Sequence, residues 1–349
     1  MDTAADKIGF AIREGRRYED GGMAWYVRLQ GQGETGLYTS AIQKPDLLLC
    51  EEETIMRCDK ADGKFDMRTD VYSIGEVKKR NSKDNEKVSY LELAGKVNFL
   101  LEAQDGRYAA PGIQLLGWEI ILTLFNQGGS VSTHPLNINQ FPEEFLRILL
   151  GITFADGIIL SFNHTISPVK DDQKQIQISL PDQDYIVFID MLLFSSGSLH
   201  GRGTTVWCSK VTICKQPEEE VVLKDSWVDP LRQFSEGRIL KMLGEAGVKG
   251  IPVLVHEQQV QMQHPITGQF LNQSTHILRS LVTVDSRALY YLHVLSCLVS
   301  KPRGHPLFNF TCLAELLVGI IDCLCGGSSL AVSSIWHGIL TSSSPPQCS

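Results

Sequence analysis

The sequence lacks the apolar segments that would take a protein into or across a membrane. No apolar run reaches the ~20 residues that a spanning helix needs, and the nearest approach, Leu313 to Leu324, contains Glu315 and Asp322. The amino-terminal residues hold no apolar stretch of the kind found in a secretory signal. These absences favour a cytoplasmic or nuclear protein with no membrane partner.

Zinc-site cysteine spacing and an excess of positive charge are absent as well. None of the nine cysteines forms a Cys-x-x-Cys pair, and Cys323 with Cys325 lacks the second ligand pair that structural zinc requires. The formal net charge is −8, whereas nucleic-acid binding is driven by clustered Lys and Arg. We therefore expect reduced, buried cysteines, and a nucleic-acid partner is not favoured.

The chain does have an ordinary globular composition, with 43% hydrophobic and 21% charged residues over 349 positions, which is enough for two domains. Residues 1–40 are polar and Gly-rich and predict a partly ordered lead-in. Residues 41–166 are expected to form an α/β domain, residues 167–180 a linker with little to bury, and residues 181–322 a second domain. The Ser-rich residues 323–349 show neither helical nor strand periodicity.

Periodicity predicts the elements of both domains. In the first, apolar residues at helical spacing predict a helix over residues 88–104, branched and aromatic residues predict a strand over 113–125, and Pro142 opens a second helix. In the second, the predicted order is strand, Gly-rich turn, two strands, a helix over residues 230–244, and a further strand. This order is typical of an α+β fold and not of a doubly wound sheet.

A Gly-rich segment in the second domain is the first candidate for chemistry. It contains Gly197, Gly201 and Gly203, and strand character returns at Val206. Glycines between antiparallel strands let the backbone approach phosphate oxygens and turn its N–H groups toward them. A plain hairpin turn explains the same residues, so this segment alone does not decide between the two.

Two charged residues come after the glycines in a meaningful order. Lys224 ends a strand, and Glu236 lies on an amphipathic helix. Taken singly, each is typical of a solvated surface. Nucleotide-dependent kinases need a strand lysine for the α and β phosphates and a helix glutamate that orients its ammonium. The glycines, the lysine and the glutamate together favour this chemistry.

At this point the chain resembles the fungal-type protein kinase family. The matching phrases are EVKKR at Glu76, FLRILLGITFAD at Phe145, LHGRGTTVW at Leu199, VLKDSWVDPLRQFSEGRIL at Val222 and GIPVLV at Gly250. The resemblance covers roughly residues 44–322 and implies an ATP-dependent Ser/Thr phosphotransferase with a protein-kinase-like N-lobe. It also implies Mg²⁺ as cofactor and a hinge near Val299 that meets adenine, with Val206 and Leu298 lining the pocket.

The chain departs from the family after the hinge. A helix is expected over residues 310–323, giving a partial helical C-lobe, but no His-Arg-Asp catalytic loop comes after it, and Thr341 stands after Leu340 where the loop would begin. The resemblance thus implies ATP binding at most. A shifted reading frame, a retained intron and a truncated pseudokinase all fit the tail. The helix would expose an apolar face that could recruit a protein partner, so a non-catalytic interaction scaffold is the alternative function.

The first domain offers a second function. Pro45-Asp46 and, further on, Glu76-Val77-Lys78 match the Pro-Asp … Glu-x-Lys pattern of restriction-endonuclease-like folds. In such sites two carboxylates bind Mg²⁺, and a lysine two residues later lies on the same strand face and helps to activate water. A salt-bridged strand explains the same charged residues without a site. The alternatives for the domain are an active nuclease, an inert domain of similar fold, and an unrelated α/β extension.

Overall fold

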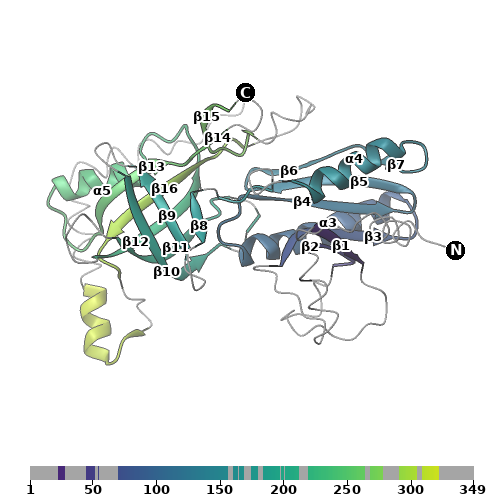
Figure 1. Cartoon of the computed structure of the whole chain (residues 1–349). Helices are drawn as coiled ribbons and strands as arrows, with labels where there is room; N and C mark the ends of the chain where they lie inside the picture. Colours follow the sequence, from purple (N-terminus) through teal and green to yellow (C-terminus); the bar gives the residue numbers. More distant parts are fainter. Residues whose placement is uncertain are drawn as a thin grey trace, which may run out of the picture. The chain divides into compact units, whose positions relative to one another are not determined.

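The computed structural model (Figure 1) shows two compact units, each of which is assembled from separate stretches of the chain. The first unit comprises residues 1–164, 195–203 and 262–293, and the second comprises residues 165–194, 204–261 and 294–349. The residues described are 23–27, 45–51, 54, 70–155, 160–163, 165–168, 174–179, 184–196, 198–199, 201–211, 219–263, 268–277, 291–304 and 309–321.

In its described residues, the first unit is built on a seven-stranded sheet. The neighbouring strands are, in order, β1 (Met23–Val27), β2 (Leu47–Glu51), β3 (Val71–Lys78), β4 (Ala109–Leu116), β5 (Glu119–Asn126) and β6 (Gly129–Ser132), with β7 (Leu136–Asn137) on β5. All neighbours pair antiparallel except β3 and β4, which are parallel. A parallel pair needs a crossover connection, and α3 (Lys83–Ala103) provides it.

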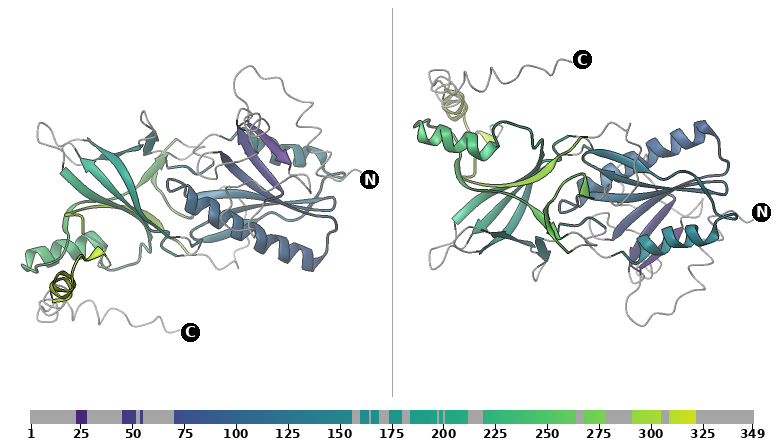
Figure 2. Two further views of the ribbon diagram at one scale, coloured as in Figure 1. Left: turned by 90° about the horizontal axis from the view of Figure 1, so that it is seen from below. Right: turned by 90° about the horizontal axis from the view of Figure 1, so that it is seen from above.

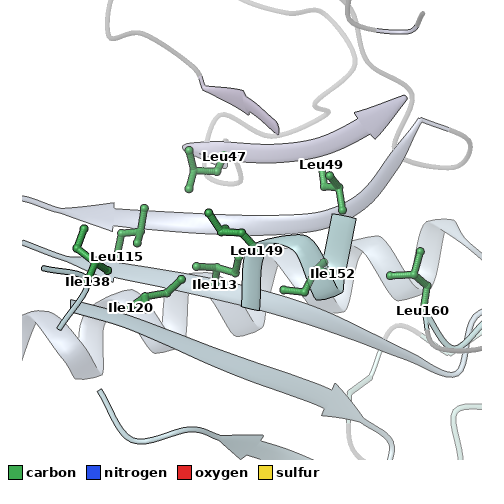
Figure 3. Packing of buried hydrophobic residues seen from close by; sticks show 9 residues of the cluster. All are labelled: Leu47, Leu49, Ile113, Leu115, Ile120, Ile138, Leu149, Ile152 and Leu160. Carbon is green, nitrogen blue, oxygen red and sulfur yellow. The ribbon is translucent and has the colours of Figure 1, made fainter. Parts of the chain in front are cut away.

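Helices α3 and α4 (Pro142–Thr153) pack on opposite faces of this sheet (Figure 1). Helix α3 begins at Ser82, whose hydroxyl accepts a hydrogen bond from the Asn85 N–H at 3.1 Å. Its buried stripe contacts Ile74 and Phe125 on one face. Figure 3 shows Leu149 and Ile152 of α4 in the core of the other face, which also contains Leu47, Leu49, Ile113, Leu115, Ile120, Ile138 and Leu160.

The first unit also includes later parts of the chain, which pack on the turn between β5 and β6. The Asn126 side-chain amide donates to the Thr275 carbonyl at 3.1 Å, and the Gly128 N–H donates to the Asn126 side-chain oxygen at 2.9 Å. A Cβ atom on Gly128 would lie only 2.8 Å from the Tyr291 carbonyl oxygen. Asn126 and Thr275, which are 149 positions apart in the sequence, therefore pack together in one unit.

The second unit contains another seven-stranded sheet among its described residues. Its strands are, in spatial order, β13 (Val253–Gln259), β16 (Val294–Lys301), β12 (Glu219–Val228), β11 (Thr205–Val211), β10 (Asp184–Ser195), β9 (Lys174–Ser179) and β8 (Ile166–Pro168). Helix α5 (Glu236–Glu245) comes after β12, and Figure 2 shows it beside the sheet in two further views. The short strands β14 (Gln261–Gln263) and β15 (Phe270–Asn272) pair with each other, and residues 313–321 are helical.

The α+β class and most predicted elements are confirmed, with two differences. The single strand predicted over residues 113–125 is a hairpin, because Gly117 at φ +61° turns the chain between β4 and β5. The linker predicted over residues 167–180 is wrong for its described part, which includes β8 and β9. Ile176 and Ile178 are 1% and 3% exposed. A half-buried strand needs apolar residues only at alternate positions, so the polar composition hid it.

Among the helices in the described part of the chain, none is long and apolar enough to cross a membrane.

Candidate functional site

Lys224 and Glu236 form the ion pair that the sequence predicts. The Lys224 Nζ lies 2.7 Å from both carboxylate oxygens of Glu236. Lys224 lies on β12 and Glu236 is the first residue of α5. The side chains are 23% and 39% exposed, so the pair is sheltered yet open to a ligand.

Glu257 on β13 fixes the start of helix α5. Its carboxylate accepts the Gly237 N–H at 3.0 Å and the Ser235 hydroxyl at 2.6 Å. Ser235 is also the N-cap, since its oxygen accepts the Arg238 N–H at 3.2 Å. Glu257 thereby holds the turn that presents Glu236 to Lys224. No motif in the sequence points to Glu257, which is simply an acidic residue in a polar strand.

Register across the strands determines which residues share a face with Lys224. Lys224 pairs with Val206 on β11 and with Leu298 on β16. Directly opposed residues point to the same face of a sheet, so Val206 and Leu298 flank Lys224 as pocket-lining residues would. Val299 pairs with Leu223 and is buried on the other face. Only the backbone of Val299 is thus available to the hinge role that the resemblance implies.

Asp225, the residue after Lys224, points into the core of the second unit. It is buried, its Oδ1 has no hydrogen-bond partner, and it is paired in register with Cys297. Burial raises the pKa of Asp225 to about 7, against a hydrogen bond from the Cys297 thiol that lowers it. A carboxyl of this kind favours its protonated form in the folded chain.

The predicted glycine loop belongs to the compact first unit, although the sequence analysis assigned it to the second domain. Leu199 packs against the α3-side core of the sheet. Gly203 has φ +44°, and a Cβ atom there would lie 2.5 Å from the Gln127 side-chain carbon Cδ. Gly201 has φ +108° with open space around it. Gly197 lies outside the described residues.

We expect Gly203→Ala to destabilise the first unit by about 1–3 kcal/mol, because the alanine is strained at positive φ and also meets Gln127. Gly201→Ala is the comparison variant, since Gly201 also has a positive φ, +108°, but has open space around it. Urea unfolding curves of both variants measure the two losses. Because +44° lies close to the left-handed region that alanine can enter and +108° does not, a loss below about 1 kcal/mol for Gly203→Ala would show that Gln127 yields without cost.

The structure brings together the three residues of the nuclease-like pattern. The Asp46 carboxylate, just before β2, accepts the Val77 N–H at 2.9 Å. Glu76 and Lys78 occupy alternate positions of β3, so both lie on one face. Lys78 Nζ is 2.5 Å from Glu92 on α3. The pattern thus forms a charged cluster between the sheet and α3.

Lys96 completes this cluster, although it is not part of the Pro-Asp … Glu-x-Lys pattern. Its ammonium donates to the Glu76 carboxylate, and the two side chains are 8% and 2% exposed. Burial raises the pKa of Glu76 to about 7, although the Lys96 charge and hydrogen bond lower it and the Asp46 charge raises it. Lys96 lies three residues after Leu93 and four before Leu100, within the apolar stripe of α3. A lysine within an apolar stripe is the feature of the sequence that could have indicated a buried acidic partner.

The cluster does not fit the Mg²⁺ that the nuclease hypothesis implies. A divalent cation needs carboxylate oxygens free to face it, whereas an ammonium already occupies the Glu76 carboxylate. Within the described ranges, no group of three or more His, Cys, Asp or Glu side chains is arranged to hold a metal ion. We therefore derive no metal-dependent step from these residues.

The helical residues 313–321 expose the apolar face that the sequence predicts. The exposed side chains include Leu313, Leu317, Val318, Ile320 and Ile321. The residues after Leu340, where the catalytic loop would begin, lie outside the described part of the chain.

Comparison with known proteins identifies one family. A family model described as fungal protein kinase matches residues 44–338, which is most of the chain. The match begins where the resemblance was expected to begin and extends past Asp322 to Gly338. No curated protein and no solved structure matches the chain.

Proposed function

The chain belongs to the fungal protein kinase family, and we propose that it binds ATP through Lys224. The observation that carries the proposal is the Lys224–Glu236 pair, with 2.7 Å to each carboxylate oxygen. An ammonium group has three donors. Glu236 takes two of them, so one N–H of Lys224 is left in a fixed direction for a phosphate oxygen.

The surroundings of Lys224 support the same ligand. Val206 and Leu298 flank it on an apolar face suited to a flat base. When bound with ATP, Mg²⁺ would neutralise phosphate charge. The 349 residues contain no His-Arg-Asp sequence, and transfer needs that catalytic base, so the proposal ends at binding.

A thermal-shift titration with Mg·ATP tests this function. Ligand at about one hundred times its Kd stabilises the folded state by about 2.7 kcal/mol, so wild type should melt several degrees higher. Lys224→Ala should lose the shift, because the phosphates lose their cation. Lys241→Ala, at an exposed lysine of α5, is the matched control and should keep it. No shift in wild type, or equal shifts in wild type and Lys224→Ala, would reject the proposed pocket.

A non-catalytic interaction scaffold is the alternative that an absent shift would favour. Its contact surface would be the exposed apolar face of residues 313–321.

For the first unit we propose an inert domain of nuclease-like fold. Its order of three antiparallel strands, a crossover helix and a parallel strand, with Asp46 and Glu76 on one face, is compatible with that fold. The Lys96 ammonium on Glu76 argues against activity. Mg²⁺-dependent cleavage of DNA that disappears in Glu76→Ala would instead establish an active nuclease.

A further inference from the structure

The charged cluster between β3 and α3 contains more carboxylates than lysines. The acidic members are Asp46, Glu76 and Glu92, and the basic members are Lys78 and Lys96. Asp46 accepts from the N–H of Val77, next to Glu76, and Glu92 pairs with Lys78, two residues after Glu76, so the three acids lie close together. Such a group repels itself unless positive charge is placed among its members.

The two lysines occupy different environments. Lys78 pairs with Glu92 at the rim, where the side chains are 26% and 42% exposed. Lys96 and Glu76 are almost fully buried. Burying either charge alone would cost several kcal/mol, by an order-of-magnitude estimate, whereas a hydrogen-bonded pair offsets much of that cost. Lys96 and Glu76 can therefore both be buried, because each charge offsets the desolvation cost of the other.

One oxygen of each carboxylate that a divalent cation would use is already taken. One Glu76 oxygen accepts from Lys96, and one Asp46 oxygen accepts from the Val77 N–H. A divalent cation bound to the Glu76 carboxylate would lie against the buried Lys96 ammonium, and the two positive charges would repel each other. Lys96 reaches Glu76 from α3, the layer that faces β3.

We propose that the Lys96 ammonium is a built-in substitute for a divalent cation in this carboxylate cluster, and that its removal opens a divalent-cation site on Asp46 and Glu76. The inference concerns the first unit and does not depend on nucleotide binding. A lysine in the place of the cation explains why Asp46 and Glu76 of the nuclease-like pattern are present although they are not arranged to hold a metal ion.

Electron paramagnetic resonance of Mn²⁺, titrated into the full chain at pH 8, tests the proposal. Wild type and Lys87→Met, which changes an exposed lysine of the same helix, should bind no Mn²⁺ that depends on Glu76. Lys96→Met should bind one more Mn²⁺ per chain than wild type. Lys96→Met combined with Glu76→Gln should lose that ion again.

Two results would overturn the inference. One is Mn²⁺ binding by wild type that Glu76→Gln removes, since the cluster would then accept a cation beside Lys96. The other is a folded Lys96→Met chain that gains no Mn²⁺. Lys96→Gln, which keeps a polar end near the acids, replaces Lys96→Met if circular dichroism shows the latter unfolded. The comparison of wild type with Glu76→Gln needs neither Lys96 variant. It tests by itself whether Lys96 already takes the place of a divalent cation.

Discussion

Arg107→Met should destabilise the first unit by more than about 3 kcal/mol. Arg107 is a buried cation at the junction of α3, β3 and β4. Its guanidinium donates to the carbonyls of Tyr72 at 2.6 Å, Ala109 at 2.9 Å and Leu160 at 3.2 Å, and to the Gln104 side-chain oxygen at 2.9 Å.

The size of this effect depends on the groups that the substitution leaves behind. Burial lowers the pKa of Arg107 to about 9, and its partners in the described residues are uncharged oxygens and the Phe162 ring, 4.8 Å from the guanidinium carbon. Methionine keeps the length of the stem but supplies no donor. The buried acceptors then lose hydrogen bonds that water cannot replace, and each such loss costs about 1–3 kcal/mol.

Urea unfolding and hydrogen exchange of the β3 and β4 amides measure this loss. Arg147→Met is the matched control, because Arg147 is exposed on α4 and surface substitutions usually change stability by less than about 0.5 kcal/mol. Arg107→Lys should fall between the two, since it keeps the charge without the planar fork. A change below about 1 kcal/mol in Arg107→Met would mean that Arg107 is not a structural centre of the unit.

Asp225→Asn should make the second unit more stable at pH 8 and change little at pH 4. The pKa of Asp225 is about 7 in the folded chain, above the ordinary aspartate value of 3.8. The folded state therefore holds the proton more tightly, and stability falls as pH rises from about 4 through 7. A difference of about three pKa units corresponds to about 4 kcal/mol.

Hydrogen exchange of the β12 and β16 amides, measured from pH 4 to pH 8, separates this effect from that of Glu76 in the first unit. Wild type should lose protection as pH rises, after correction for intrinsic exchange, and Asp225→Asn should not. Glu245→Gln, an exposed acid on α5, should behave as wild type. Parallel curves for wild type and Asp225→Asn would show that the carboxyl ionises without disturbing the strands.

Local sequence pattern was enough to predict the elements whose residues are contiguous in the chain. Helices α3 and α4, and the strand bearing Lys224, are visible in the residue pattern, and the order of the glycines, Lys224 and Glu236 predicts the ion pair. Glu257 and Lys96 could not be assigned partners, because their contacts join a strand to the neighbouring helix, and the pattern within either element does not fix how the two pack. The side-chain direction of Val299 depends on β12–β16 register, which a residue pattern in one strand does not fix.

The three-part make-up of the first unit has a consequence for synthesis. Protein chains emerge from the ribosome in order, and the turn at residues 126–128 meets its partners Thr275 and Tyr291 only after most of the second unit has been made. The first unit therefore cannot close behind the ribosome before residue 293 is available. Fragments ending near residue 164 would expose this turn, so expression of the first unit needs the distant segments supplied in the same polypeptide or in trans.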